Sequence, residues 1–329
     1  MTPANIFTLI LCASWASLMV CGCTRSSASP RPAIAVVPMG TTDEYWKAIH
    51  AGAIKAGKDN NVDIIWQGTM RHDDRSGQID VVQAMIVRGV EGIVLAPVDN
   101  MALRGPVEDA YRNKIPVVII DTDLHSDKYV SFIATNNYEG GSMAGEYMAK
   151  LLKDNGRVAM LRGTEGNAST DNRERGFLDA IAKHPGIKVV SANQHGGSTS
   201  ETAYKAAENI LAPLKLADGS MALDGVFAPS EGTVFGMLRA LQDGGVAGKV
   251  HFIGFDSSAK LNKALADKQI DALVLQNPVL MGYLGVQAVI DRNHGKKVEP
   301  KVDVPATLIT QDNYREPAMK VLLEPELPD

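Results

Sequence analysis

Polar residues that could hold a small molecule recur directly after short β-branched runs of the sequence. They lie in five segments, at residues 38–43 (PMGTTD), 121–123 (DTD), 229–231 (PSE), 255–257 (FDS) and 276–277 (QN). In an open parallel sheet, ligands bind beyond the carboxyl ends of the strands, where loops lead into helix N-termini. Any one of these side chains could be an ordinary helix N-cap. Five such segments at the same structural place predict the polar floor of a binding pocket.

The sequence lacks the signatures of common catalytic sites. It contains no G-x-S-x-G elbow, no H-E-x-x-H motif and no G-x-G-x-x-G loop after a strand. The glycine-rich residues 244–250 (GGVAGKV) fail the spacing of a phosphate-binding loop and lack its Ser or Thr. We therefore expect a binding protein that needs no cofactor, metal or catalytic residue, with an enzyme as the competing class.

The elements that must position these residues alternate between short β-branched runs and helical patterns, as in parallel βαβ units. Ten strands are predicted to begin at residues 33, 62, 92, 116, 130, 157, 187, 225, 251 and 271. Nine helices are predicted near residues 45–58, 76–88, 102–113, 140–152, 171–183, 200–214, 232–243, 259–268 and 281–294. Ten strands separated by helices suit two sheets better than one, so we expect an α/β protein with two parallel-sheet lobes.

Length and charge agree with a two-lobed binding protein. A chain of 329 residues, of which 45% are hydrophobic and 22% charged, exceeds what one core usually fills. The net charge is −5, and Lys and Arg are scattered along the chain. Without a basic stripe, nucleic acid is not an expected partner.

The N-terminus predicts export and a lipid anchor. Residues 1–22 contain no charged side chain, and residues 6–20 form an apolar run too short to span a bilayer comfortably. Residues 1–22 therefore read as a signal peptide, and the run ends in Val20-Cys21-Gly22-Cys23. This ending is similar to the bacterial lipobox, in which the last cysteine is diacylated after cleavage, so Cys23 is the predicted anchor and residues 23–32 a tether.

One feature departs from this pattern, because no Lys or Arg precedes the apolar run. A mis-assigned start codon could explain the departure, and a buried N-terminal helix of a cytosolic protein is the alternative. Removal of Cys12 and Cys21 with the signal peptide would leave neither a disulfide nor a cysteine-based metal site.

Short motifs also follow one another in a characteristic order along the chain. They are YW at 45–46 with GA at 52–53, GIVLAP at 92–97, IPVV at 115–118 leading into Asp121, IATNN at 133–137 with GG at 140–141, RERGF at 173–177, VFA at 226–228, LRAL at 238–241 and IGFD at 253–256. Each motif is weak by itself. In this order, residues 33 to 310 resemble the ribose-binding-protein family of periplasmic sugar-binding proteins.

The resemblance implies a periplasmic binding protein type 1 fold, in which two doubly wound parallel-sheet lobes are joined by a three-strand hinge. Carried over, the N-terminal lobe is 33–135 plus 277–304, and the C-terminal lobe is 136–276 plus 305–329. The sequence alone would have divided the chain once, near Asn137.

The resemblance further implies a set of ligand-binding residues. The matched positions are Tyr45, Trp46, Asp121, Arg173, Asp256 and Gln276. The aromatic pair would stack on a sugar ring, and it is expected to face a cleft rather than the core. Carboxylate, amide and guanidinium groups suit sugars because each hydroxyl both donates and accepts. Arg173 is preferred to Arg175 for its spacing to Gly176, and is expected to be an exposed cleft side chain.

Other positions depart from the ribose binder. Thr122 replaces an Arg beside the first-lobe Asp, Ser230 followed by Glu231 replaces an Asn, and Asp43 replaces a first-loop Asn. A second-lobe aromatic is missing near His195, which is expected to lie in a loop. The additional carboxylates and the lost ring predict a different pentose, a hexose or a polyol.

The function implied by the resemblance is that of a substrate-binding lipoprotein of an ABC importer. It would act as a monomer in the periplasm or at the cell surface, closing on a neutral monosaccharide or polyol and delivering it to the permease. A LacI-type repressor shares the binding core, but carries a helix-turn-helix module where this chain has an apolar leader. A sugar-sensing co-receptor for a sensor kinase or chemoreceptor would have the same pocket, and is the alternative.

Overall fold

The computed structural model describes residues 31–71, 73–197 and 199–327. The predicted signal peptide, the predicted lipidation site at Cys23 and most of the predicted tether lie outside these residues. The chain from Arg31 onward is one compact unit built on two β-sheets.

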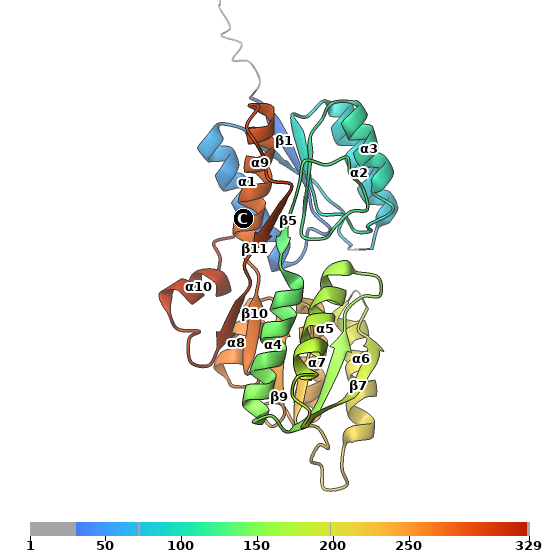
Figure 1. The fold of residues 1–329 in the computed structure, drawn as a ribbon, viewed down its shortest axis with the longest axis vertical. Coiled ribbons are helices and arrows are strands. Elements are labelled where there is room, and N and C mark those ends of the chain that lie inside the picture. The colour runs from blue at the N-terminus through green and yellow to red at the C-terminus, as the bar shows by residue number, and fades with distance from the viewer. Residues whose placement is uncertain (1–30, 72, 198, 328–329) are drawn as a thin grey trace, which may run out of the picture. The chain divides into compact units, whose positions relative to one another are not determined.

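Six parallel strands form the first sheet, in the order β2-β1-β3-β4-β5-β11; β1, β5 and β11 are labelled in Figure 1. They are β1 (Ala33–Val37), β2 (Asp63–Trp66), β3 (Gly92–Leu95), β4 (Val117–Ile120), β5 (Ser131–Thr135) and β11 (Lys301–Val304). Strands β3 and β4 are buried along their whole length. They contain only apolar residues and glycine because both faces of the sheet are covered by helices.

The second sheet repeats this order as β7-β6-β8-β9-β10-β12. Its strands are β6 (Gly156–Arg162), β7 (Ile187–His195), β8 (Gly225–Phe227), β9 (His251–Phe255), β10 (Ala272–Leu275) and β12 (Thr307–Thr310). All pairs are parallel except the last, in which β12 runs antiparallel to β10. The prediction of parallel sheets is wrong for this edge strand. Only residues 305–306 join β11 to β12, so the chain enters the second sheet from the side where β10 ends and runs opposite to it.

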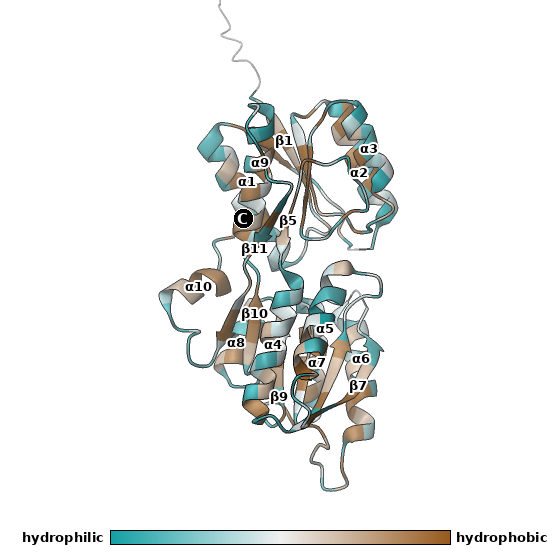
Figure 2. Ribbon diagram, viewed as in Figure 1, coloured by the Kyte–Doolittle hydropathy of each residue, from teal (hydrophilic) through white to brown (hydrophobic). Residues whose placement is uncertain are grey.

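Helices cover both faces of each sheet, with their apolar residues turned inward (Figure 2). On the first sheet, α1 (Glu44–Asn60) and α9 (Pro278–Asn293) cover one face, and α2 (Arg75–Arg88) and α3 (Arg104–Arg112) the other. On the second sheet, α4 (Asn137–Leu152) and α5 (Ala168–Ile181) cover one face. The opposite face carries α6 (Ser200–Leu211), the short 3₁₀ turn η1 (Ala212–Leu214), α7 (Glu231–Asp243), α8 (Ala259–Ala266) and α10 (Pro317–Leu323).

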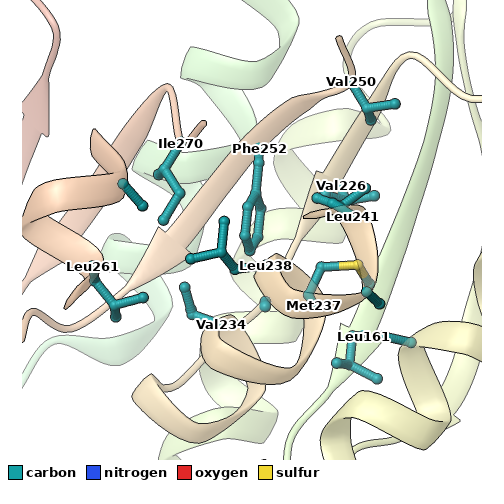
Figure 3. Close-up of a cluster of buried hydrophobic side chains, with 14 of the residues drawn as sticks. Leu161, Val226, Val234, Met237, Leu238, Leu241, Val250, Phe252, Leu261 and Ile270 are labelled. Carbon is teal, nitrogen blue, oxygen red and sulfur yellow. The ribbon is translucent and has the colours of Figure 1, made fainter. Parts of the chain in front are cut away.

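The packing of α7 shows how sequence spacing creates this core (Figure 3). Its apolar residues recur at helical spacing and face Val226 of β8 and Phe252 of β9; they are Val234, Met237, Leu238 and Leu241. Phe252 has no exposed surface, and burial of such a side chain stabilises the fold by roughly 1.5 to 3 kcal/mol. Helix α7 is therefore held against the second sheet by its apolar face.

The chain passes between the two sheets three times, from β5 to α4, from β10 to α9 and from β11 to β12. The lobe limits predicted above, 33–135 with 277–304 and 136–276 with 305–329, remain a proposal. The membership of β11 in the first sheet and β12 in the second supports it.

The predicted fold class, two α/β lobes with parallel sheets, is confirmed. The sequence analysis missed β11, β12 and α10. It also placed the starts of α4, α5 and α9 three residues too late. Each of these helices begins with an asparagine cap whose side chain accepts a backbone N–H, at Asn136, Asn167 and Asn277. The first turn is polar in α4 and α5, so it does not show the apolar period of the following turns.

Candidate ligand-binding cleft

Loops at the carboxyl ends of strands from both sheets enclose a cavity of about 220 Å³. All ten side chains predicted above to bind a ligand line it: Asp43, Tyr45, Trp46, Asp121, Thr122, Arg173, Ser230, Glu231, Asp256 and Gln276. The cavity is smaller than the roughly 300 to 1,000 Å³ of pockets for drug-sized ligands. Its size and polar lining suit a small hydroxylated molecule. The binding role of each residue remains a prediction.

The two sheets present a carboxylate in the same way. Asp121 directly follows β4 and Asp256 directly follows β9, with backbone φ angles of 66° and 69°. Their backbone N–H groups donate to Ile133 and Val274 on the neighbouring strands. The other five non-glycine residues with positive φ in the described chain all follow helices. Left-handed backbone at a strand end is strained for aspartate, and both residues line the cavity.

Tyr45 connects Asp121 to Gln276, which directly follows β10. Its hydroxyl donates to Asp121 Oδ1 at 2.5 Å and lies 3.4 Å from Gln276 Oε1. A phenol has one proton to donate, so the shorter contact takes it. Burial, followed by the charge of Asp121, raises the pKa of Tyr45 well above its ordinary value. Tyr45 is therefore a neutral donor that orients Asp121.

Trp46 differs from the expectation for the aromatic pair. Its side chain is only 4% exposed and belongs to the core between α1 and the first sheet. The rings of Tyr45 and Trp46 are perpendicular, with centroids 5.0 Å apart. The expected exposure of the aromatic pair is wrong for Trp46, which is buried although it also lines the cavity, because Trp46, Ile49 and Ala53 share the buried face of α1.

Arg173 is buried and held by several contacts within the protein. Its Nε donates to Asn137 Oδ1 at 2.7 Å and its Nη1 to the carbonyl oxygen of Pro229 at 2.8 Å. The guanidinium also lies 3.6 Å from Asp256 Oδ2 and 3.9 Å from the ring centre of Phe255. Only 3% of Arg173 is exposed, so the expectation of an exposed cleft arginine is wrong. The reason is that α4 and α5 pack closely enough for Asn137 to reach it.

A glycine makes this close packing feasible. A Cβ atom on Gly141 of α4 would collide with the backbone carbonyl of Arg173 on α5. Only glycine allows the two helix backbones to approach this closely. The GG motif at 140–141 therefore determines where the guanidinium of Arg173 lies.

Asp256 is the centre of the polar groups on the second sheet. It accepts hydrogen bonds from Gln276 Nε2 at 2.7 Å and from the backbone N–H of Glu231 at 3.2 Å. Burial raises the pKa of Asp256, and the nearby Arg173 opposes that rise. Because Gln276 also contacts Tyr45, a continuous set of polar contacts runs from Arg173 to Asp121 across the hinge.

Two of the small polar residues act through their neighbours. Thr122 donates to Asp121 Oδ2 at 3.0 Å and so helps to orient that carboxylate. Ser230 is the N-cap of α7, and its hydroxyl lies 3.0 Å from that of Thr233. Ser230 is therefore an ordinary helix N-cap, the alternative given above for single strand-end residues, although it also lines the cavity.

Several lining residues were missed in the sequence. Asp99 and Asn100 come soon after β3, and residues 164–170 follow β6. The strand-end rule used above would have found these segments had it been applied to every strand. Asp99 forms an ion pair with Arg75 at 2.7 Å.

His195 is the last residue of β7 and its Nδ1 lies 3.1 Å from the carbonyl oxygen of Gly163, so the expected loop position is wrong. The reason is that His195 pairs with Arg162 at the end of β6, so the strand continues to this residue.

Two further properties concern the described residues only. Among them, no group of three or more His, Cys, Asp or Glu side chains is arranged to hold a metal ion. No helix in this part of the chain is both long and apolar enough to cross a membrane.

Comparisons with known proteins agree with this architecture. The ribose import binding protein RbsB of Bacillus subtilis (strain 168) is 29% identical over 267 residues, covering 81% of this chain and 83% of the relative. A carbohydrate transporter solute binding protein from Agrobacterium radiobacter, solved with D-arabinose, is 30% identical with a TM-score of 0.82. The match covers 90% of this chain and all of that structure.

A second structural relative has a different sugar. An ABC transporter solute binding protein from Agrobacterium vitis, solved with α-D-tagatopyranose, is 27% identical with a TM-score of 0.83, covering 90% of this chain and 100% of that one. The family described as the periplasmic binding protein domain matches residues 34–297 of this chain. Together with the two parallel-sheet lobes and the cleft at their strand ends, this match shows that the chain belongs to the periplasmic binding protein family, on the branch that resembles the ribose-binding proteins.

Proposed function

We propose that this protein captures a neutral monosaccharide or a related polyol in the cleft and delivers it to the permease of an ABC importer. The observation that carries the proposal is the convergence of carboxylates, an amide, a phenol and a guanidinium from both sheets on one small cavity. Each sugar hydroxyl both donates and accepts a hydrogen bond, so this mixture of acceptors and donors suits it. The names of the relatives, which bind ribose, arabinose or tagatose, support the same class of ligand.

The charge of the cleft favours neutral ligands over anions. Seven carboxylate residues line the cavity, namely Asp43, Asp73, Asp99, Asp121, Glu165, Glu231 and Asp256, against two arginines, Arg75 and Arg173. Both arginines already face carboxylates, at Asp99 and Asp256 respectively. A phosphate group would therefore meet a negative field with no available basic partner among these residues.

Binding would be coupled to closure. Tyr45 on α1 and Asp121 after β4 are associated with the first sheet, whereas Arg173 on α5 and Asp256 after β9 are associated with the second. A sugar that contacts both sets would favour a closed state by its differential affinity for that state. The permease would then recognise the closed form. A sensing role as co-receptor would use the same cleft and is the second candidate; neighbouring permease and ATPase genes would favour transport, and a neighbouring sensor kinase gene would favour sensing.

We further propose that the mature protein is a monomer held at the membrane by a lipid on Cys23. The motif Val20-Cys21-Gly22-Cys23 supports this anchor. Mass spectrometry of detergent-extracted protein should find a diacylated N-terminal Cys23. An intact Met1, or complete release without detergent, would contradict it.

A thermal-shift screen of residues 31–329 against pentoses, hexoses and polyols tests the function. A cognate sugar at a hundredfold excess over its Kd should stabilise the fold by about 2.7 kcal/mol, and small-angle scattering should show compaction. The 5-phosphate of a binding pentose is the matched control and should give no shift. The proposal fails if none of these compounds stabilises the protein, or if the sugar phosphate binds more tightly than its parent.

A further inference from the structure

The carboxyl group of Glu231 differs from the other acidic groups of the cleft. Glu231 opens α7 and lines the cavity. Its Oε2 atom has no solvent-exposed surface and no hydrogen-bond partner among the described residues. A buried polar atom without a partner is costly, and such atoms are uncommon in folded proteins. The geometry therefore leaves one carboxyl oxygen that only a cavity occupant or a proton can satisfy.

The charged groups around Glu231 come from each element that packs near it. Asp256 follows β9, and Asp43 and Glu44 lie at the start of α1 in the first lobe. Arg173 on α5 lies 3.6 Å from Asp256, and its Nε and Nη1 donate to Asn137 and Pro229. No ion pair of the described residues includes Glu231. Glu231 is thus surrounded by other carboxylates without a cation of its own.

We propose that Glu231 determines ligand specificity by contacting the bound sugar as a neutral carboxylic acid, whose O–H donates a hydrogen bond to a sugar oxygen. The inference rests on the proposed function of the same cleft. Burial is the largest cause that raises the pKa of Glu231, to about 8, followed by the charges of Asp256, Asp43 and Glu44. The group therefore carries a proton at neutral pH.

A neutral acid at this position adds an O–H donor that is not already used within the protein, because Oε2 has no partner among the described residues. The carboxyl oxygens of Asp121 accept hydrogen bonds from Tyr45 and Thr122, and those of Asp256 accept from Gln276 and from the backbone N–H of Glu231. The phenol of Tyr45 already donates to Asp121, and the guanidinium of Arg173 donates to protein oxygens. The ring oxygen of a pyranose is an acceptor without a proton, so it needs a donor. The O–H of protonated Glu231 is such a donor, and ionisation of the carboxyl group would remove it.

The pH dependence of binding tests this role. Calorimetry would measure the Kd of D-arabinose, D-tagatose and D-ribose between pH 6.5 and pH 9.5. If only the protonated form binds, Kd should rise about 30-fold across this range for a group with a pKa near 8. In Glu231→Gln, which keeps an N–H donor but cannot ionise, the ratio of the two Kd values should fall to near one.

Glu201→Gln is the matched control. Glu201 also lies in the first turn of a helix on the same face of the sheet, but it is exposed and pairs with Lys205 and Arg239. This variant should keep the 30-fold ratio of the natural protein. Circular dichroism at both pH values would show that each variant stays folded.

A second measurement is independent of any ligand. In protein labelled with ¹³C at the glutamate carboxyl carbon, the signal that Glu231→Gln removes should titrate near pH 8. Titration in the ordinary range of glutamate would overturn the inference while leaving the proposed function intact. So would a sugar that binds with the same Kd at both pH values, or a 30-fold ratio that survives in Glu231→Gln.

Two remaining outcomes separate failure of the neutral-acid role from failure of the proposed function. If Glu231 bound its ligand in the ionised form, D-glucosamine would bind more tightly than D-glucose, and Glu231→Gln would abolish the preference; this result would overturn the neutral-acid role. Absence of binding by all three sugars at every pH, with the glutamate signal still titrating near pH 8, would count against the proposed function instead.

Discussion

The replacement of Arg173 by alanine tests whether the cleft arginine is also a structural residue. The substitution removes the hydrogen bonds to Asn137 and Pro229, and it leaves Asp256 buried without its cation. Both side chains are almost completely buried, so solvent screens their interaction little. Removal of one partner of a buried ion pair costs about 3 to 5 kcal/mol. We therefore expect Arg173→Ala to destabilise the second lobe by that amount.

Chemical and thermal unfolding followed by circular dichroism would measure the loss. At roughly 2 to 4 °C per kcal/mol for domains of this size, Tm should fall by about 6 to 20 °C. Arg175→Ala is the control, because Arg175 lies on the same helix but is exposed, with a hydrogen bond to Asn172 and its guanidinium over the ring of Tyr138. A surface change of this kind alters stability by less than about 0.5 kcal/mol.

A double variant that combines Arg173→Ala with Asp256→Asn identifies the cause of the lost stability. If the loss in Arg173→Ala comes from an uncompensated carboxylate, replacement of Asp256 by the neutral amide should recover part of it, which a double-mutant cycle would measure as coupling. The pKa of Asp256 is already raised by burial, so the amide is expected to be tolerated. An Arg173→Ala variant as stable as Arg175→Ala would refute the reasoning, because the buried contacts would then contribute nothing net.

Two further predictions concern the elements that hold the cleft. Tyr45→Phe removes the donor to Asp121 and should destabilise the unliganded protein by about 1 to 3 kcal/mol, since it leaves a carboxylate oxygen unsatisfied; denaturant titration would measure this, and unchanged stability would contradict it. Gly141→Ala should destabilise the second lobe by several kcal/mol, since its methyl group would meet the carbonyl of Arg173. Gly105→Ala in α3, where a Cβ has open space, should instead be neutral or stabilising by up to about 1 kcal/mol.

The strand-end residues among the predicted site residues could be placed from the sequence for a simple reason, whereas Tyr45, Trp46 and Arg173 were predicted from the family resemblance. Parallel strands that belong to one sheet end at the same edge, so residues such as Asp121 and Asp256, found by their place after a strand, necessarily approach the same region of their lobes. Their distances in the sequence are irrelevant to this argument. The rule located the cleft even though it was applied to only some of the strands.

The burial of Arg173 could not be inferred in the same way. Its partners are 36 positions away at Asn137 and 56 positions away at Pro229. Local spacing says on which face of a helix a residue lies, but not which distant polar atoms will meet it. The edge strands β11 and β12 were missed for a related reason. Each has four residues, and β11 (KVDV) alternates exposed and less exposed positions without a neighbouring helix pattern.

The left-handed backbone of Asp121 and Asp256 has a consequence for how this sequence responds to selection. A residue in this conformation costs on the order of 1 to 3 kcal/mol when it is not glycine. Glycine at either position would therefore relieve strain and would remove the carboxylate at the same time. A library screened only for thermal resistance, without ligand, should accumulate glycine or asparagine at these two positions. A library screened for binding should retain aspartate, so that the two screens would diverge at the same point of both lobes.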